Sequence, residues 1–137
     1  MDFEKLLQFR NEKNAYGRFL NIKLTKIDQG YAEAVMPISD NHLNPVASVH
    51  GGCLFSIADV VASAAASSHG SAVTTLNTDF HYLRAGLNCT QIIAKAQEVK
   101  YGKRVMVYRA SVYDQNDTLL AEGTFTCMSL GKDVFSV

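Results

Sequence analysis

The strongest constraint on the fold is a run of small and apolar residues, Gly52–Ser68, which contains one charged side chain, Asp59. Alanine has the highest helix propensity of all residues, and it recurs through this run. Gly70 follows at the distance expected of a C-terminal cap. The run therefore predicts one long helix whose small side chains let another element approach closely.

The rest of the chain shows the alternation of apolar and polar residues that is typical of strands. Before the helix, the predicted strands lie at 20–25 and 31–38, and the first fifteen residues predict a short amphipathic helix. After the helix, the predicted strands lie at 76–82, 92–97, 105–113 and 119–130. In the first of these, alternation places Leu76, Thr78, Phe80 and Tyr82 on one face.

Short turns join the strands that follow the helix, so they should form an antiparallel sheet with the long helix over one face. The predicted fold class is α+β, a curled antiparallel β-sheet around one long central helix with a short N-terminal helix. A length of 137 residues suits one domain, so residues 1–137 are expected to form a single domain.

Composition narrows the classes of partner. Thirteen basic residues balance thirteen acidic ones, which argues against a nucleic acid bound mainly through its phosphates. No apolar run is long enough for a membrane span, and the first residues do not resemble a signal peptide. Three widely spaced cysteines predict neither a disulfide framework nor a structural zinc site, and favour the cytoplasm.

Asp59 raises a question, because aspartate is a poor helix former and is rarely buried without a partner. On a helical wheel it shares one stripe with small residues: Gly52, Ser56, Ser63 and Ala66. Such a stripe could face solvent. Since solvent faces usually carry Lys, Glu and Gln, a stripe of Gly, Ser and Ala fits better against another chain or a ligand.

The start of the helix, "HGG", offers a second chemical feature. The first N–H groups of a helix lack intrahelical partners, and glycine lets a ligand come close to them. An oxyanion or a phosphate would fit there, although Gly51 and Gly52 could also simply form the turn. Gly51 and Asp59 are roughly 12 Å apart along a helix, too far to act on one carbonyl. They either do not cooperate, or they meet across a two-fold axis between subunits.

At these residues the sequence resembles hotdog-fold acyl-CoA thioesterases of the PaaI-like and thioesterase superfamily member 2 type. The shared pattern is an Asn, then HGG, then an Asp nine residues after the His, matched by Asn44, His50, Gly51, Gly52 and Asp59. The segments "TTLNTDFHYLRAG" and "EVKYGKRVMVYRASVYDQNDTLLAEGTFTCM" resemble the family's later strands. The resemblance implies a homodimer with sheets paired edge to edge and active sites at the interface, with a tetramer of two dimers common among relatives.

The resemblance also implies roles for individual residues. Gly51 N–H would polarise the thioester carbonyl with help from Asn44, and Asp59 of the partner subunit would activate water or attack the acyl carbon itself. Thr75 matches a hydroxyl residue that positions the water, and His50 is expected to be mainly structural. Cys53, at the start of the helix, is expected to pack rather than to act as a nucleophile.

Coenzyme A is expected to contact two turns. One contains Lys100, Gly102, Lys103 and Arg104, and the other contains Tyr82 and Arg84; each of these charges could instead be a solvated surface group. Arg84 departs from the proline that relatives often have near this position. CoA is part of the substrate, and no separate cofactor or metal is expected.

The expected activity is hydrolysis of a small aryl- or medium-chain acyl-CoA, with the acyl group left open. Two alternatives remain at this point: a hotdog hydratase or dehydratase acting on 3-hydroxyacyl thioesters, and a non-catalytic acyl-CoA binding protein. The spacing from HGG to Asp59 favours hydrolysis over hydration, and binding alone would not require Asp59.

Overall fold

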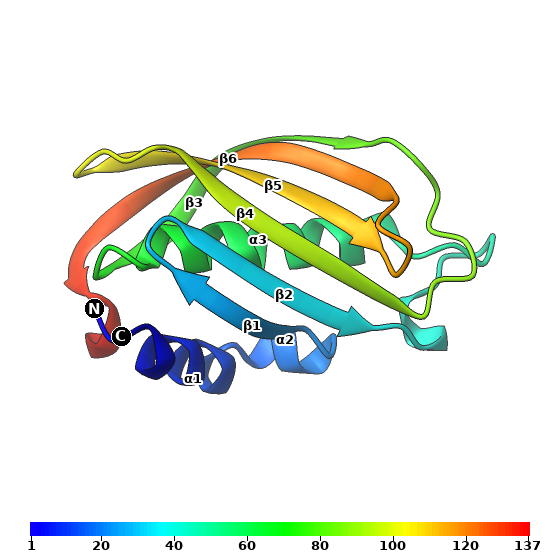
Figure 1. Ribbon diagram of the computed structural model, residues 1–137, viewed down its shortest axis with the longest axis horizontal. Coiled ribbons are helices and arrows are strands. Elements are labelled where there is room, and N and C mark those ends of the chain that lie inside the picture. Colours follow the sequence, from blue (N-terminus) through cyan, green and yellow to red (C-terminus); the bar gives the residue numbers. More distant parts are fainter.

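The computed structural model describes residues 1–137, and it contains one antiparallel sheet curled around one long helix (Figure 1). The helices are α1 (Phe3–Lys13), α2 (Ala15–Phe19), α3 (Gly51–Ser67) and the short 3-10 helices η1 (Asp40–His42) and η2 (Val134–Ser136). The strands are β1 (Lys23–Asp28), β2 (Tyr31–Pro37), β3 (Ser71–Tyr82), β4 (Gln91–Lys100), β5 (Val105–Asp114) and β6 (Leu119–Asp133). Their order in the sheet is β1-β2-β4-β5-β6-β3, with every neighbouring pair antiparallel. The predicted fold class is confirmed.

The core lies between α3 and the concave face of the sheet. α3 packs against β2, β4 and β5, and all three strands present fully buried alanines to it. Those alanines are Ala32, Ala34, Ala94, Ala96 and Ala110. Small side chains on both partners let the helix axis lie close to the sheet, so interior packing stays dense without large residues at the centre. None of the helices is long and apolar enough to cross a membrane.

Two observed boundaries differ from the predicted ones because side chains cap the helices there. α3 begins at Gly51, one residue earlier than predicted, because the His50 side chain caps it. The strand predicted from residue 20 starts only at Lys23, because the Asn14 side chain accepts a hydrogen bond from Gly17 N and begins a second short helix, α2. Turn-forming side chains of this kind compete with strand pairing.

A bulge in β3 changes which side chains face the helix. The pairing with β6 slips between Thr75 and Asn77, so that one extra residue, Leu76, is inserted in β3. Val73 and Phe80 both pack on the core although they are an odd number of residues apart, which only a bulge allows. The prediction that Leu76 shares the face of Phe80 was wrong, since Leu76 remains 51% exposed outside the core. Thr75 points toward α3 instead.

The two edges of the sheet differ in how they are covered. At the β1 edge, α1 lies alongside the strand, and the Asn11 side chain donates to Leu24 O (3.0 Å) and accepts from Leu24 N (2.9 Å). The amide thus takes the place of a neighbouring strand. β3 pairs only with β6, and most of its residues from Thr74 onward are exposed or half-buried. A long open edge is a ready site for pairing with another chain.

We expect Asn11→Ala to lower the free energy of unfolding by about 1–3 kcal/mol, because it leaves two backbone groups of Leu24 without partners. Urea denaturation followed by circular dichroism measures this difference. Gln8→Ala on the same helix is the matched control, since Gln8 makes one exposed, long hydrogen bond to Glu4. Equal stability of the two variants would show that the amide does not protect the β1 edge.

Candidate active site

The N-terminus of α3 leaves one backbone amide free. Gly52 N donates to His50 Nδ1 (2.8 Å), and Cys53 N donates to His50 O (2.9 Å). No hydrogen bond within the chain uses Gly51 N. The Gly51 amide therefore carries the unpaired N–H at the positive end of the helix dipole, where a partial negative charge is stabilised.

Gly51 lies in a hollow of about 330 Å³ at this end of the molecule. The Tyr82 hydroxyl donates to Gly51 O (3.2 Å), and a Cβ at Gly51 would come within 3.1 Å of the Tyr82 ring. A larger residue would push the ring aside, so the close approach requires glycine. The hollow brings together Asn44, Gly51, Tyr82 and Arg84 from the predicted set.

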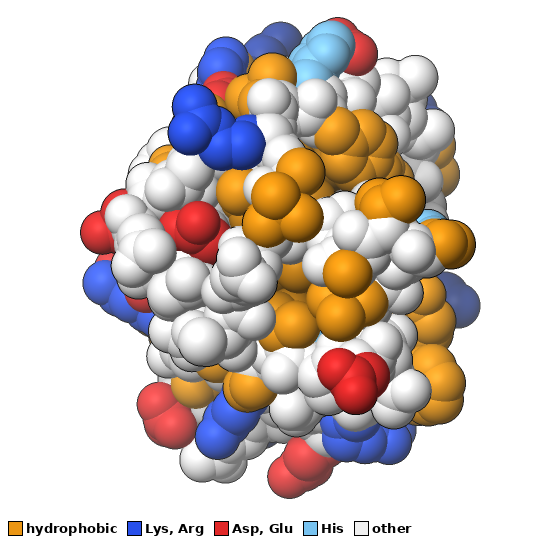
Figure 2. All heavy atoms as spheres, turned by 90° about the vertical axis from the view of Figure 1, so that its right-hand side faces the viewer, with side chains coloured by type: hydrophobic (Ala, Val, Ile, Leu, Met, Phe, Trp, Pro, Cys, Tyr) orange, Lys and Arg blue, Asp and Glu red, His pale blue; other side chains and the backbone are white.

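Apolar side chains surround this hollow. Figure 2 shows the end of the molecule on the right in Figure 1, where orange side chains gather between scattered charges. The loop before α3 and the loop after β3 meet there, joined by the hydrogen bond from Val49 N to Gly86 O (2.9 Å). Val46, Leu83 and Leu87 in these loops are all more than half exposed. Such a face suits contact with an apolar surface.

The Asn44 side chain organises the loop that forms one wall of the hollow. Its Oδ1 accepts from Val46 N and Ser48 N (both 3.1 Å), and its Nδ2 donates to Ser48 Oγ (2.7 Å). Ala47 has a φ of 60°, so the loop needs this local support. Asn44 thus lines the hollow while holding the loop in place.

Asp59 lies half-buried two turns into α3, facing β3. Thr75 Oγ1 donates to Asp59 Oδ1 at 2.7 Å, so the bulge brings these two predicted residues together. The prediction that the small-residue stripe around Asp59 lies against another chain or a ligand is wrong for its C-terminal part. Ser63 is bound by the Arg10 guanidinium of α1 and Ala66 is fully buried, so this part of the stripe packs within the chain itself.

Two other groups lie close to Asp59. Burial lowers the pKa of the Arg10 guanidinium to about 10, against the opposing effect of the Asp59 carboxylate. Burial raises the pKa of the Cys127 thiol to about 11, and Asp59 acts in the same direction. Cys127 is therefore neutral near pH 7. Burial also raises the pKa of the Cys53 thiol, which packs in the core as predicted.

Arg10 and Cys127 were not predicted from the sequence to lie near Asp59. A signal for Arg10 was present, since it follows Leu6 by four residues and so lies on the same face of α1 as a fully buried side chain. For Cys127 the sequence held no such signal. The alternation of β6 predicts that this position faces the core, but it does not indicate which residue of α3 lies opposite.

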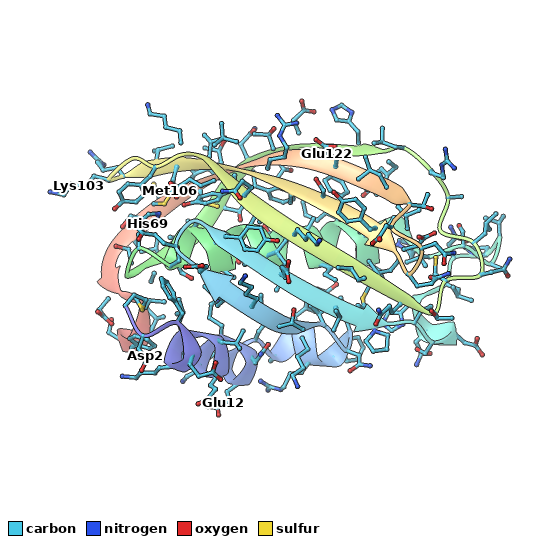
Figure 3. All side chains as sticks on the ribbon, viewed as in Figure 1. Asp2, Glu12, His69, Lys103, Met106 and Glu122 are labelled. Atoms are coloured by element: carbon cyan, nitrogen blue, oxygen red, sulfur yellow. The ribbon has the colours of Figure 1, made fainter.

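The basic turn between β4 and β5 lies at the other end of the molecule. Figure 3 shows Lys103 there, at the same end as His69. Lys103 and Arg104 line a hollow of about 710 Å³ together with Tyr101 and Lys132. Lys100, the last residue of β4, is exposed. Gly102 forms the tight turn that follows, because a Cβ at this position would lie only 2.2 Å from Val105 O.

The structure therefore divides the predicted residues into three groups within one chain. Asn44, Gly51, Tyr82 and Arg84 lie at one end, Asp59 and Thr75 lie at the middle of α3, and the basic turn lies at the far end. No group of three or more His, Cys, Asp or Glu side chains is arranged to hold a metal ion. Within a single chain, the Asp59 carboxylate therefore does not reach the free Gly51 amide.

Comparison with known proteins connects this arrangement with one family. Residues 47–121 match the Thioesterase superfamily, which is more than half of the chain. The acyl-coenzyme A thioesterase PaaI of Escherichia coli strain K12 is 32% identical over 110 residues, which cover 80% of this chain and 79% of that protein.

Solved structures agree with this match. The E. coli PaaI protein from the phenylacetic acid degradation operon superposes with a TM-score of 0.86 at 28% identity, covering 93% of this chain and 98% of that one. A hypothetical thioesterase of Streptococcus pneumoniae TIGR4, solved with coenzyme A, superposes with a TM-score of 0.82 at 25% identity, covering 92% and 97%. The hotdog arrangement predicted from the sequence is thereby confirmed.

We expect His50→Ala to cost about 0.5–2 kcal/mol of unfolding free energy, because it removes the N-cap of α3. His50→Asn is the matched variant, since asparagine is among the best N-cap residues and should keep most of the stability. Thermal and urea denaturation of both variants measure the difference. If His50→Ala is as stable as the native chain, the capping role is wrong.

Proposed function

The chain belongs to the Thioesterase superfamily and is a thioester hydrolase, and from this premise we propose that it hydrolyses acyl-CoA with Gly51 and Asp59 as its catalytic groups. The observation that carries the proposal is the free Gly51 amide at the start of α3, in a hollow that also contains Tyr82 and Arg84. A single unpaired N–H aimed into a hollow suits a carbonyl oxygen that becomes an oxyanion.

In the proposed reaction, the thioester oxygen accepts from Gly51 N–H, with Asn44 holding the adjoining loop. Asp59 takes a proton from water, the hydroxide adds to the acyl carbon, and the resulting oxyanion is stabilised by Gly51. The C–S bond then breaks, and the departing thiolate takes the proton from Asp59, which releases the carboxylic acid and the CoA thiol and regenerates the carboxylate. Thr75, at 2.7 Å from Asp59, would orient the carboxylate and the water. CoA is the leaving group, and the proposal involves no further cofactor.

The proposal requires two subunits. Eight residues of helix separate Gly51 from Asp59, roughly 12 Å, while a base must lie within hydrogen-bond reach of the water that attacks the same carbonyl. The open β3 edge offers a surface for a two-fold pairing that would extend the sheet. In that arrangement Gly51 of one subunit faces Asp59 of the partner subunit. A tetramer of two such dimers is the proposed assembly.

A two-fold pairing also accounts for the separated basic turn. Antiparallel β3 strands would place the far end of one chain beside the Gly51 end of its partner. Lys100, Lys103 and Arg104 would then reach the phosphates of CoA, with Tyr82 and Arg84 at the mouth of the hollow. The S. pneumoniae thioesterase solved with coenzyme A, which shares this fold, supports CoA as the leaving group.

The proposed substrates are small aryl- or medium-chain acyl-CoA esters. The hollow beside Gly51 is modest in size, and its Tyr82 ring packs on Phe80, which in turn packs on Phe55 and Phe125. Such aromatic surroundings accept either a ring or a short aliphatic chain. The three free cysteines favour action in the reducing cytoplasm.

We expect Asp59→Asn to reduce turnover of acyl-CoA by at least about 10², the lower end for loss of a general base. Folding and assembly should change little, because the two side chains are nearly isosteric and Thr75 can still donate to the amide oxygen. Thiol release over a panel of acyl-CoA esters measures the effect. An enoyl-CoA included in the panel separates hydrolysis from hydration, which changes absorbance without releasing thiol.

Shared active sites can be tested by mixing two inactive variants. Asp59→Asn removes the base, and Gly51→Val blocks the amide against Tyr82. In a random mixture, half of the dimers carry one of each chain, and each of these has one intact site if sites are shared. We expect about a quarter of native activity on co-expression. No recovery from correctly assembled mixed dimers would mean that each site lies within one chain.

A further inference from the structure

Arg10 is a half-buried cation without a carboxylate in hydrogen-bond contact. Its Nη2 donates to Ser63 Oγ (2.8 Å), and its Nη1 donates to Ser67 Oγ (3.2 Å). Its Nε is shielded from solvent and has no hydrogen-bond partner, although the residue as a whole is half-buried. A charge enclosed in this way is costly unless an opposite charge compensates it.

The position of the two serines identifies that opposite charge. Asp59, Ser63 and Ser67 are spaced by four residues, so they form one row along α3. The Cβ atoms of neighbours in such a row are roughly 5–6 Å apart, so Arg10, bound to Ser63, holds its guanidinium on the helical turn next to Asp59. Arg10 forms no direct salt bridge with any acidic side chain.

The other groups that face Asp59 carry no charge near neutral pH. From β3 the Thr75 hydroxyl donates to Asp59, and on β6 the nearby Cys127 thiol is kept protonated by burial. A half-buried carboxylate loses hydration, which favours its protonated form, while a nearby cation favours the ionised form. On α1, Arg10 is the group that supplies this cation.

We propose that Arg10 is a positioning residue, which α1 holds against the serines of α3 so that its positive charge stabilises the Asp59 carboxylate that faces Thr75. This inference rests on the proposed function of Asp59 as base. It gives the N-terminal helix a part in the chemistry, although α1 lies outside the strands and helix that carry the reacting groups. The two serine hydroxyls hold the cation on the turn of α3 next to Asp59.

The test is the pH dependence of kcat/KM for Arg10→Gln. The amide can still donate to a serine, so folding is preserved while the charge is lost. A general base works only when ionised, so activity falls as pH drops below its midpoint. Without the cation the carboxylate takes up a proton at higher pH, and we expect the acidic limb to move upward by about one pH unit or more.

Two further variants make the outcome decisive. Lys13→Gln removes a neighbouring charge from the same helix and should leave the acidic limb in place. Ser63→Ala with Ser67→Ala releases the guanidinium while favouring the helix, and should move the limb in the same direction as Arg10→Gln. An unmoved limb in both Arg10→Gln and the serine variant would overturn the proposal.

A measurement independent of turnover separates this inference from the proposed function. The titration midpoint of the Asp59 carboxyl carbon, followed by NMR and assigned with Asp59→Asn, should rise in Arg10→Gln. If the native chain releases no thiol but this midpoint still rises, the catalytic proposal fails and the charge coupling stands. If thiol is released and the midpoint stays, Arg10 is structural only.

Discussion

The whole structure depends on burying an alanine-rich helix against alanine-rich strands. Because both surfaces consist of small side chains, α3 can lie close to the concave face of the sheet and be enclosed by it. The enclosed helix still needs its first amides satisfied, and His50 satisfies one of them with its own side chain. What remains is a rigid helix with one amide free, at a fixed place in the molecule. Packing of α3 and its cap thus fix the position of the free Gly51 amide.

Much of this was predictable from the sequence, because the signals are strong and local. The run at 52–68 and the alternating segments around it are sufficient for a curled sheet around one helix. The HGG turn likewise predicts a free amide, since the backbone chemistry of a helix start does not depend on distant residues. The distance from Gly51 to Asp59 follows from helix geometry alone, and it is the ground on which a site shared between subunits is proposed.

Long-range features were not predictable in the same way. Alternation assigns faces only while a strand is regular, and the bulge at Leu76 reverses the assignment for every residue on one side of it. The contact between Thr75 and Asp59 depends on that reversal. Similarly, the partner of Ser63 comes from a helix more than fifty residues away, so the helical wheel could mark a special stripe but could not say what covers it.

The two edges of the sheet have different tasks: the β1 edge is covered, and the β3 edge stays open for the proposed pairing with a partner subunit. The β1 edge is closed by α1, whose Asn11 replaces a strand and whose Arg10 reaches across to α3. One short helix therefore blocks pairing at one edge and places a cation near Asp59. The β3 edge, which carries Thr75 and ends at Tyr82, must stay open if a partner is to bring a second α3 alongside. Closing that edge within the chain would stabilise a monomer, but it would leave Gly51 and Asp59 roughly 12 Å apart, so the proposed shared site could not form.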